Sequence, residues 1–135
     1  MKVLGIDHIG VAVNSIEKAM DFYRRALNME LGGGEDIPER HLKVGFLETG
    51  DARIELIEAT SEEAATAKYI AQRGEGIHHI CIRVDDIEAA LEQFKAEGFR
   101  LIDETAKPGA EGAKVAFVHP KSSNGVLIEL KELPE

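Results

Sequence analysis

The hydrophobic and polar positions of the chain follow a pattern that occurs twice, with an offset of 71 residues between Ile6 and Ile77. The stretches IDHIGVAVNSIEKAMDFY and IHHICIRVDDIEAALEQF align without a gap. Each begins with strand-like alternation and continues with the period of an amphipathic helix. The later stretches KVGFLETGDARIELIE and KVAFVHPKSSNGVLIELKE also correspond, with three extra residues in the second copy. The sequence therefore predicts two copies of one βαβββ unit.

The repeat also predicts how the chain is divided. With 135 residues and no low-complexity segment, the chain has the length and composition of one domain. The predicted parts are a single domain over 1–135, a first module at about 4–59, a linker helix at about 61–73 and a second module at about 76–132. Within the modules we expect strands near 5–13 and 77–84 and helices near 15–27 and 86–97.

Polar residues and glycines mark where the predicted helices begin and end. Asn14 and Asp85 each stand three residues before a glutamate at the start of a helical pattern. This is the spacing of a capping box, so we expect these two residues to be N-caps. Ser61 is the expected cap of the linker helix, which Gly74 ends. Gly98 is the expected residue after the second module helix.

Two adjacent histidines, His78 and His79, lie in an otherwise apolar strand of the second copy. Adjacent strand residues point to opposite faces of a sheet, so only one of the pair can face a given side. In both copies the branched aliphatic residues share one face, which must pack on the helices. His8 and its repeat equivalent His79 fall on the other face, where small residues leave space. We therefore expect His8 and His79 to point into a cup, and His78 to point the other way or to sit at the strand edge.

Two glutamates obey the same alternation. Glu55 and Glu129 are equivalent in the repeat, each in the string Ile-Glu-Leu, and each falls on the cup face. A lone histidine or glutamate in a strand is usually a hydrogen-bonded or solvent-facing residue. Buried carboxylates are costly without a positive partner, however, and the repeat brings four polar residues to equivalent positions. The four side chains predict a site for one divalent metal ion.

The donor types restrict which metal the site would hold. Two imidazoles and two carboxylates give a neutral site with no thiolate. Such a set suits six-coordinate Co²⁺, Mn²⁺, Ni²⁺, Fe²⁺ or Zn²⁺ with two positions open, and we expect Co²⁺ to serve in vitro.

Composition excludes several partners. The net charge of −9 disfavours nucleic acid, which requires a basic face. No apolar run is long enough to span a membrane. Met1 stands a few residues before the first strand, and the one cysteine, Cys81, cannot form an internal disulfide. A cytoplasmic protein without a membrane partner is therefore the expectation.

Four stretches carry a family resemblance: IDHIGVAV, RIELIEA, RGEGIHHICIRVDDIEAAL and HPKSSNGVLIEL. The chain resembles the vicinal oxygen chelate superfamily, also known as the glyoxalase/bleomycin resistance/dioxygenase superfamily, and within it the methylmalonyl-CoA epimerases. The resemblance implies an α+β fold in which two pseudo-symmetric βαβββ modules form a curved mixed sheet around a metal-binding cup, with the helices on the outer face. It places the metal ligands at His8, Glu55, His79 and Glu129, and it implies a homodimer.

The resemblance also implies an activity. The enzyme would be an isomerase that interconverts (2R)- and (2S)-methylmalonyl-CoA by α-proton removal and return through a metal-stabilised enolate. Glu129 takes one acid/base role. Where some relatives carry a further glutamate this chain has Val44 or Gly45, so Glu55 is the candidate for the second role.

Two positively charged residues are candidates for contacts with the CoA part of the substrate. Arg83 falls on the cup side of its strand, and Lys121 lies in the HPKSSNGV loop. These two cations are the candidates for binding the CoA thioester.

Other functions remain open at this stage. A glyoxalase I-like lactoylglutathione lyase uses the same four ligand types, and the double histidine and the HPKSSNGV loop favour the epimerase over it. A non-catalytic small-molecule-binding protein of the same superfamily would not need four metal ligands. A ring-cleaving dioxygenase would use two histidines and one carboxylate, so a fourth ligand at Glu55 disfavours it.

Overall fold

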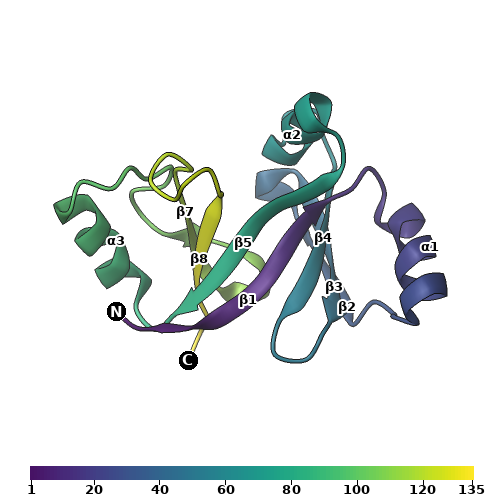
Figure 1. Cartoon of the computed structure of the whole chain (residues 1–135), viewed down its shortest axis with the longest axis horizontal. Helices are drawn as coiled ribbons and strands as arrows, with labels where there is room; N and C mark the ends of the chain where they lie inside the picture. The colour runs from purple at the N-terminus through teal and green to yellow at the C-terminus, as the bar shows by residue number, and fades with distance from the viewer. The chain divides into compact units, whose positions relative to one another are not determined.

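The computed structural model describes all residues 1–135 and contains eight strands and three α-helices (Figure 1). The chain forms two compact units: unit 1 is Met1–His8 with His79–Glu135, and unit 2 is Ile9–His78. The units differ from the sequence modules because β1 (Val3–Ala12) and β5 (Gly76–Val84) each contribute residues to both. The expected extent of a single domain, 1–135, stays a prediction.

Unit 2 is built on strands in the hydrogen-bonded order β2-β3-β4-β1. Its elements are the end of β1, α1 (Ile16–Leu27), β2 (Gly33–Ile37), a 3-10 turn (Pro38–Arg40), β3 (Leu42–Glu48), β4 (Arg53–Ala59), α2 (Ala65–Arg73) and the start of β5. The β3–β4 hairpin pairs Phe46 with Glu55 and Gly45 with Leu56. The expected order of strand, helix and three strands is thereby confirmed for the first module.

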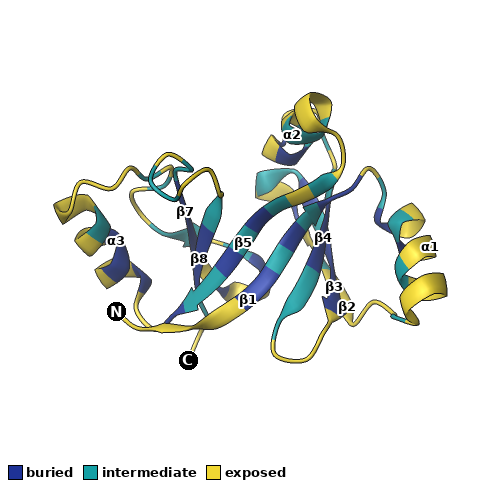
Figure 2. Cartoon of the chain, viewed as in Figure 1, coloured by how far each residue is buried: buried dark blue, intermediate teal, exposed yellow.

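The core of unit 2 lies between α1 and one face of its strands. Ile16 and Met20 of α1 pack with Val13, Leu47 and Leu56. All five residues are buried, whereas Figure 2 shows exposed, yellow segments along α1. Burial of these aliphatic side chains contributes roughly 1.5–3 kcal/mol each. Because Leu56 faces α1, its neighbour Glu55 lies on the opposite face of β4.

Unit 1 repeats this plan with strands in the order β1-β5-β8-β7-β6. Its further elements are α3 (Ile87–Ala96), β6 (Lys107–Pro108), a 3-10 turn (Ala110–Gly112), β7 (Lys114–Val118) and β8 (Ile128–Glu132). Strand β8 runs parallel to β5 and antiparallel to β7. Ile87 and Leu91 of α3 pack against Val84, Ala116 and Leu130. The predicted α+β architecture of two βαβββ modules is confirmed.

The helix N-caps differ by one residue from the expectation. Ser15, not Asn14, accepts the hydrogen bond from the Lys18 amide. Asp86, not Asp85, accepts the one from the Ala89 amide. The prediction of capping boxes was wrong. In each helix, a carboxylate from a strand, and not the glutamate of the first turn, accepts the hydrogen bond from the first free amide.

These strand carboxylates are also related by the repeat. Glu58 accepts from the Ile16 amide at 2.7 Å, and Glu132 accepts from the Ile87 amide at 2.8 Å. Each ties the start of a module helix to the strand that carries the predicted ligand glutamate.

Of the three other expected helix signals, Gly74 ends α2 as predicted, and Ser61 and Gly98 had different outcomes. Helix α2 begins at Ala65 rather than near Ser61, whose hydroxyl accepts a hydrogen bond from the Glu63 amide in a preceding turn. Gly98 follows the last turn of α3 at φ +83°, as predicted.

Candidate metal centre

Three buried side chains of unit 1 bring imidazole and carboxylate donors together. His8 comes from β1, His79 from β5 and Glu129 from β8. The Nε2 atoms of the two histidines are 3.1 Å apart. The Oε1 atom of Glu129 lies 3.3 Å from Nε2 of His8 and 2.9 Å from Nε2 of His79. We call these three residues, each at most 4 % exposed, the donor cluster.

The strands position the donor cluster through their alternation. Ile128 and Leu130 pack with the α3 core, so Glu129 points to the opposite face of β8. On β5, the ring of His79 meets the donor cluster, whereas the ring of His78 lies 4.9 Å from that of Tyr69. The predicted separation of the two adjacent histidines is confirmed.

The spacing of these donor atoms suits a metal ion. Bonds of about 2.0–2.1 Å at angles of 90–109° place neighbouring ligand atoms about 2.9–3.4 Å apart. The three distances between the donors, 2.9, 3.1 and 3.3 Å, all fall in that range. Two neutral imidazoles and a carboxylate are also ligands that divalent first-row metals accept. The residues of the donor cluster therefore fit a divalent cation.

A second set of charged residues in unit 1 is linked to His8 through Asp7. Nδ1 of His8 lies 2.7 Å from Oδ1 of Asp7. Asp7 also accepts hydrogen bonds from Arg83 at 2.7 Å and from Lys131 at 3.1 Å. Lys131 in turn donates to Glu111 at 2.7 Å. We call Asp7, Arg83, Lys131 and Glu111 the charge network.

Most of this network was not predicted from the sequence. Strand alternation could have predicted the position of Lys131, because this residue stands two residues beyond Glu129 and therefore on the same face of β8. Asp7 gave no such signal, since strand alternation places adjacent side chains on opposite faces.

Burial and charge act against one another in the pKa values of these groups. Burial by itself would raise the pKa of Asp7, but hydrogen bonds from His8 and Arg83 and the charge of Lys131 hold it well below its usual range. Burial would likewise raise the pKa of Glu129, but the two histidines lower it. Burial would lower the pKa of Lys131, yet its pairing with Glu111 and Asp7 raises it.

These shifts predict an acid-sensitive fold. Asp7 and Glu129 bind protons more weakly in the folded chain than in the unfolded chain, whose ordinary pKa values are 3.8 and 4.5. Their contribution to stability is fully present above about pH 4.5 and is lost as the pH falls toward the lowered values. Urea unfolding of chelated protein at successive pH values checks this. The stability difference between wild type and Asp7→Asn should shrink as the pH falls, and a constant difference would contradict the assignment.

Glu55, the remaining predicted ligand, lies in unit 2. Its side chain is buried on β4 and pairs across the hairpin with Phe46. Glu129 has the same setting in unit 1, where it pairs with Phe117. The two glutamates thus occupy equivalent places in the two hairpins. The role of Glu55 as a ligand stays a prediction.

The two positions considered for a further acid/base differ in orientation. Gly45 pairs with Leu56 on the α1 face, where an added Cβ would lie 2.9 Å from Cδ2 of Leu31. Val44 pairs with Ile57 and therefore shares the face of Glu55. Val44 is buried and aliphatic, so it cannot transfer a proton.

The predicted substrate cations have different surroundings. Arg83 directs both Nε and Nη2 at Oδ2 of Asp7, at 3.2 and 2.7 Å. Lys121 lies exposed in the loop between β7 and β8, and its backbone amide donates to Nδ1 of His119. Binding of substrate by either residue stays a prediction.

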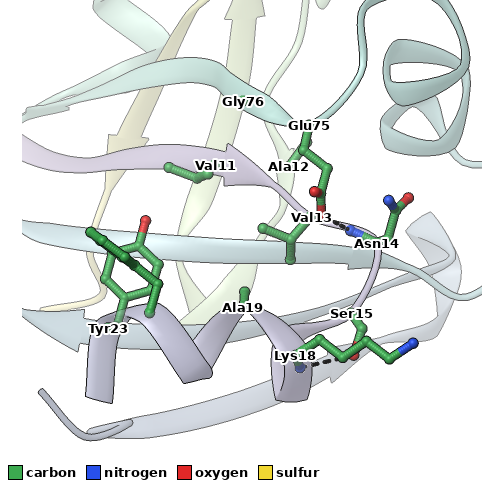
Figure 3. Close-up of a pocket in the computed structure, with 11 residues that line it drawn as sticks. Val11, Ala12, Val13, Asn14, Ser15, Lys18, Ala19, Tyr23, Glu75 and Gly76 are labelled. Carbon is green, nitrogen blue, oxygen red and sulfur yellow. Dashed lines mark hydrogen bonds between the residues drawn. The ribbon is translucent and has the colours of Figure 1, made fainter. Parts of the chain in front are cut away.

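Unit 2 also contains a surface pocket of about 480 Å³ (Figure 3). It lies between α1, where Ala19 and Tyr23 line it, and the end of β1. None of its lining residues is a histidine. Its carboxylate, Glu75, accepts a hydrogen bond from the Asn14 amide. This pocket therefore offers no set of donors comparable to the donor cluster.

None of the helices combines the length and the apolar character needed to cross a bilayer.

Comparison with known proteins places these features in a family. Residues 7–117 match the family model described as the glyoxalase/bleomycin resistance protein/dioxygenase superfamily. The chain is 36 % identical to the mitochondrial methylmalonyl-CoA epimerase of Bos taurus, over 94 % of this chain and 73 % of that protein.

The chain is also similar to solved structures. A hypothetical protein from Bacillus halodurans C-125 is 48 % identical, with a TM-score of 0.93 over 96 % of this chain and 94 % of that one. A methylmalonyl-CoA epimerase in complex with methylmalonyl-CoA and NH4+ is 30 % identical, with a TM-score of 0.92 over 98 % and 96 % of the two chains. A lactoylglutathione lyase of Neisseria meningitidis is less similar, at 28 % identity over 87 % of this chain and 91 % of the lyase.

Proposed function

Because this chain belongs to the glyoxalase/bleomycin resistance protein/dioxygenase superfamily, we propose that it is an isomerase that interconverts the (2R) and (2S) epimers of methylmalonyl-CoA. The observation that carries the proposal is the donor cluster, whose buried atoms have the spacing of ligands around one metal ion. Similarity to epimerases over most of the chain supports this substrate over others used within the superfamily.

The metal centre of the proposed enzyme has four ligands. Glu55 joins the donor cluster, an assignment supported by its equivalence to Glu129 in the two hairpins. We expect Co²⁺ in vitro, while Mn²⁺, Ni²⁺, Fe²⁺ and Zn²⁺ suit the same donors. When bound, the ion supplies a Lewis acid that stabilises negative charge on the substrate oxygens.

Epimerisation requires proton transfer on both faces of the α-carbon. Glu129 is the base on one face, and its lowered pKa keeps the carboxylate ionised, which is the form that accepts a proton. Glu55 serves on the other face, because the position of a further acid/base is held by the aliphatic Val44. Both glutamates are buried, which limits the access of water to their carboxylates.

The remaining parts of the proposal concern partners. The substrate is a CoA thioester, toward which Arg83 and Lys121 are the candidate cations. A homodimer and a cytoplasmic location are proposed from the family resemblance and the composition.

Solvent exchange tests this function directly. An epimerase acting through an enolate should incorporate deuterium at C2 when either epimer of methylmalonyl-CoA is incubated with Co²⁺-loaded protein in D₂O. NMR and mass spectrometry should show an intact thioester and an approach to equal amounts of the epimers. The control is the same protein kept in excess chelator, where exchange should fall to the uncatalysed rate.

The same preparation separates the alternatives. Conversion of a hemithioacetal of methylglyoxal and glutathione, without exchange into methylmalonyl-CoA, would assign the chain to the lyases. Binding of either compound without turnover would indicate a sequestering protein.

A further inference from the structure

The carboxylate of Asp7 is held in one orientation within unit 1. Asp7 is 1 % exposed, and its two oxygens face different partners. Oδ1 lies 2.7 Å from Nδ1 of His8 and 3.1 Å from Nζ of Lys131. Oδ2 accepts from both Nη2 and Nε of Arg83, at 2.7 and 3.2 Å, so partners on both oxygens restrict rotation of the carboxylate. The oxygen nearest His8 therefore has little freedom to move.

The contact with Asp7 determines which nitrogen of His8 carries the proton. An ionised carboxylate can only accept hydrogen bonds, so Nδ1 of His8 must be the donor. In the neutral imidazole the lone pair then lies on Nε2. That nitrogen faces Nε2 of His79 and Oε1 of Glu129, at 3.1 and 3.3 Å. The Asp7 contact thus places the lone pair of His8 on the nitrogen that belongs to the donor cluster.

Lys131 links Asp7 to a second carboxylate. Its side chain is 2 % exposed, and its ammonium group donates to Glu111 at 2.7 Å as well as to Asp7. Glu111 reaches it from a backbone with φ +63°, a region that non-glycine residues rarely adopt. A buried ammonium is costly unless it is paired, so the two carboxylates and Lys131 stabilise one another's positions.

The repeat provides a natural comparison for Asp7. The residue that precedes the second ligand histidine is His78, which contacts the ring of Tyr69. Asp7 and His78 therefore stand at the same position relative to a ligand histidine, and His78 has a different environment. A carboxylate residue directly precedes the ligand histidine in the first copy, whereas a histidine does so in the second.

We propose that Asp7, held in place by Lys131 and Arg83, is a positioning residue that fixes the tautomer and orientation of His8 for metal binding. The proposal deepens the proposed function and rests on it only in taking His8 as a ligand. Outer partners of ligating histidines act in this way in other metal sites, where their loss typically costs about 10–100-fold in metal affinity.

Metal affinity without substrate provides the test. Calorimetric titration of chelator-stripped protein with Co²⁺ should show binding about 10–100-fold weaker in Asp7→Asn than in wild type. The amide can donate to Nδ1, which moves the proton to Nε2 and blocks the ligand atom. The matched control, His78→Asn, should bind Co²⁺ like wild type. The visible absorption spectrum of bound Co²⁺ should change in Asp7→Asn only.

A double variant separates positioning from a general loss of stability. Asp7→Asn leaves Lys131 with one carboxylate partner fewer, which lowers stability by itself. Adding Lys131→Met removes that ammonium, so stability of the chelated protein should recover while Co²⁺ affinity stays low. Recovery of both together would overturn the proposal and leave Asp7 a purely structural role.

The wild-type titration distinguishes this inference from the proposed function. Wild-type binding combined with unchanged affinity in Asp7→Asn would overturn the role of Asp7 and leave the metal centre standing. If wild type bound no Co²⁺, the metal centre and the role of Asp7 would both be overturned.

Discussion

Replacement of His79 by alanine is expected to abolish tight metal binding, whereas replacement of His78 is expected to leave it intact. His79 contributes Nε2 to the donor cluster, 2.9 Å from Glu129. His78 is the adjacent residue, but its ring lies against Tyr69. The two variants therefore remove the same side chain from neighbouring positions of one strand, and strand alternation predicts opposite results.

Metal analysis after dialysis measures this difference. Wild type and His78→Ala should retain close to one equivalent of Co²⁺, while His79→Ala retains close to none. Bound metal also stabilises the native state by mass action, so chelation should lower the melting temperature of wild type and have little effect on His79→Ala. Chelation should abolish epimerase activity, and added Co²⁺ or Mn²⁺ should restore it. Equal occupancy in His79→Ala and wild type would remove the basis for the metal centre.

Replacement of Glu129 by glutamine is expected to separate metal binding from catalysis. The amide keeps the shape of the side chain and an oxygen ligand, so Co²⁺ should still bind, at weaker affinity. It cannot accept the α-proton, and turnover of methylmalonyl-CoA should fall about 10²–10⁴-fold. The measurement pairs a Co²⁺ titration with the initial rate of deuterium incorporation at C2.

Glu132 provides a matched control for this variant. It lies three residues beyond Glu129 on β8, and its carboxylate accepts the Ile87 amide. Glu132→Gln keeps an acceptor oxygen for that amide, so turnover should remain near the wild-type rate. Near-wild-type turnover in Glu129→Gln would move the base elsewhere, and Glu55 would then be the residue to replace.

Much of the fold and of the candidate site could be predicted from the sequence because the relevant geometry is local. Strand alternation has a period of two, so the aliphatic positions beside His79 and Glu129 were enough to assign each side chain to a face. Repetition of that pattern, with offsets of 71 residues from His8 to His79 and 74 from Glu55 to Glu129, brought His8 and Glu55 into the prediction. The structure brings His8, His79 and Glu129 together within unit 1, as expected.

Helix starts show the limit of local spacing. Asn14 and Asp85 had the distance of a capping box from a following glutamate, yet Ser15 and Asp86 are the caps. The decisive partner lies far along the chain: in the second copy, Glu132 binds the Ile87 amide across 45 residues. A carboxylate from a distant strand competes with a carboxylate of the same helical turn for the amide at the start of the helix. Tertiary packing determines which of the two lies within hydrogen-bonding distance.

The charge network was likewise decided by tertiary structure. Alternation would have separated Asp7 from His8, but the folded chain places their side chains in contact at 2.7 Å. Lys131 stands 124 residues from Asp7, and its ammonium is buried against it. The sequence by itself determined the repeat, the strand faces and the chemistry of the donors. Tertiary structure alone decided which distant charges compensate one another, because the free energy of a buried ion depends on every partner that packing brings within hydrogen-bonding distance.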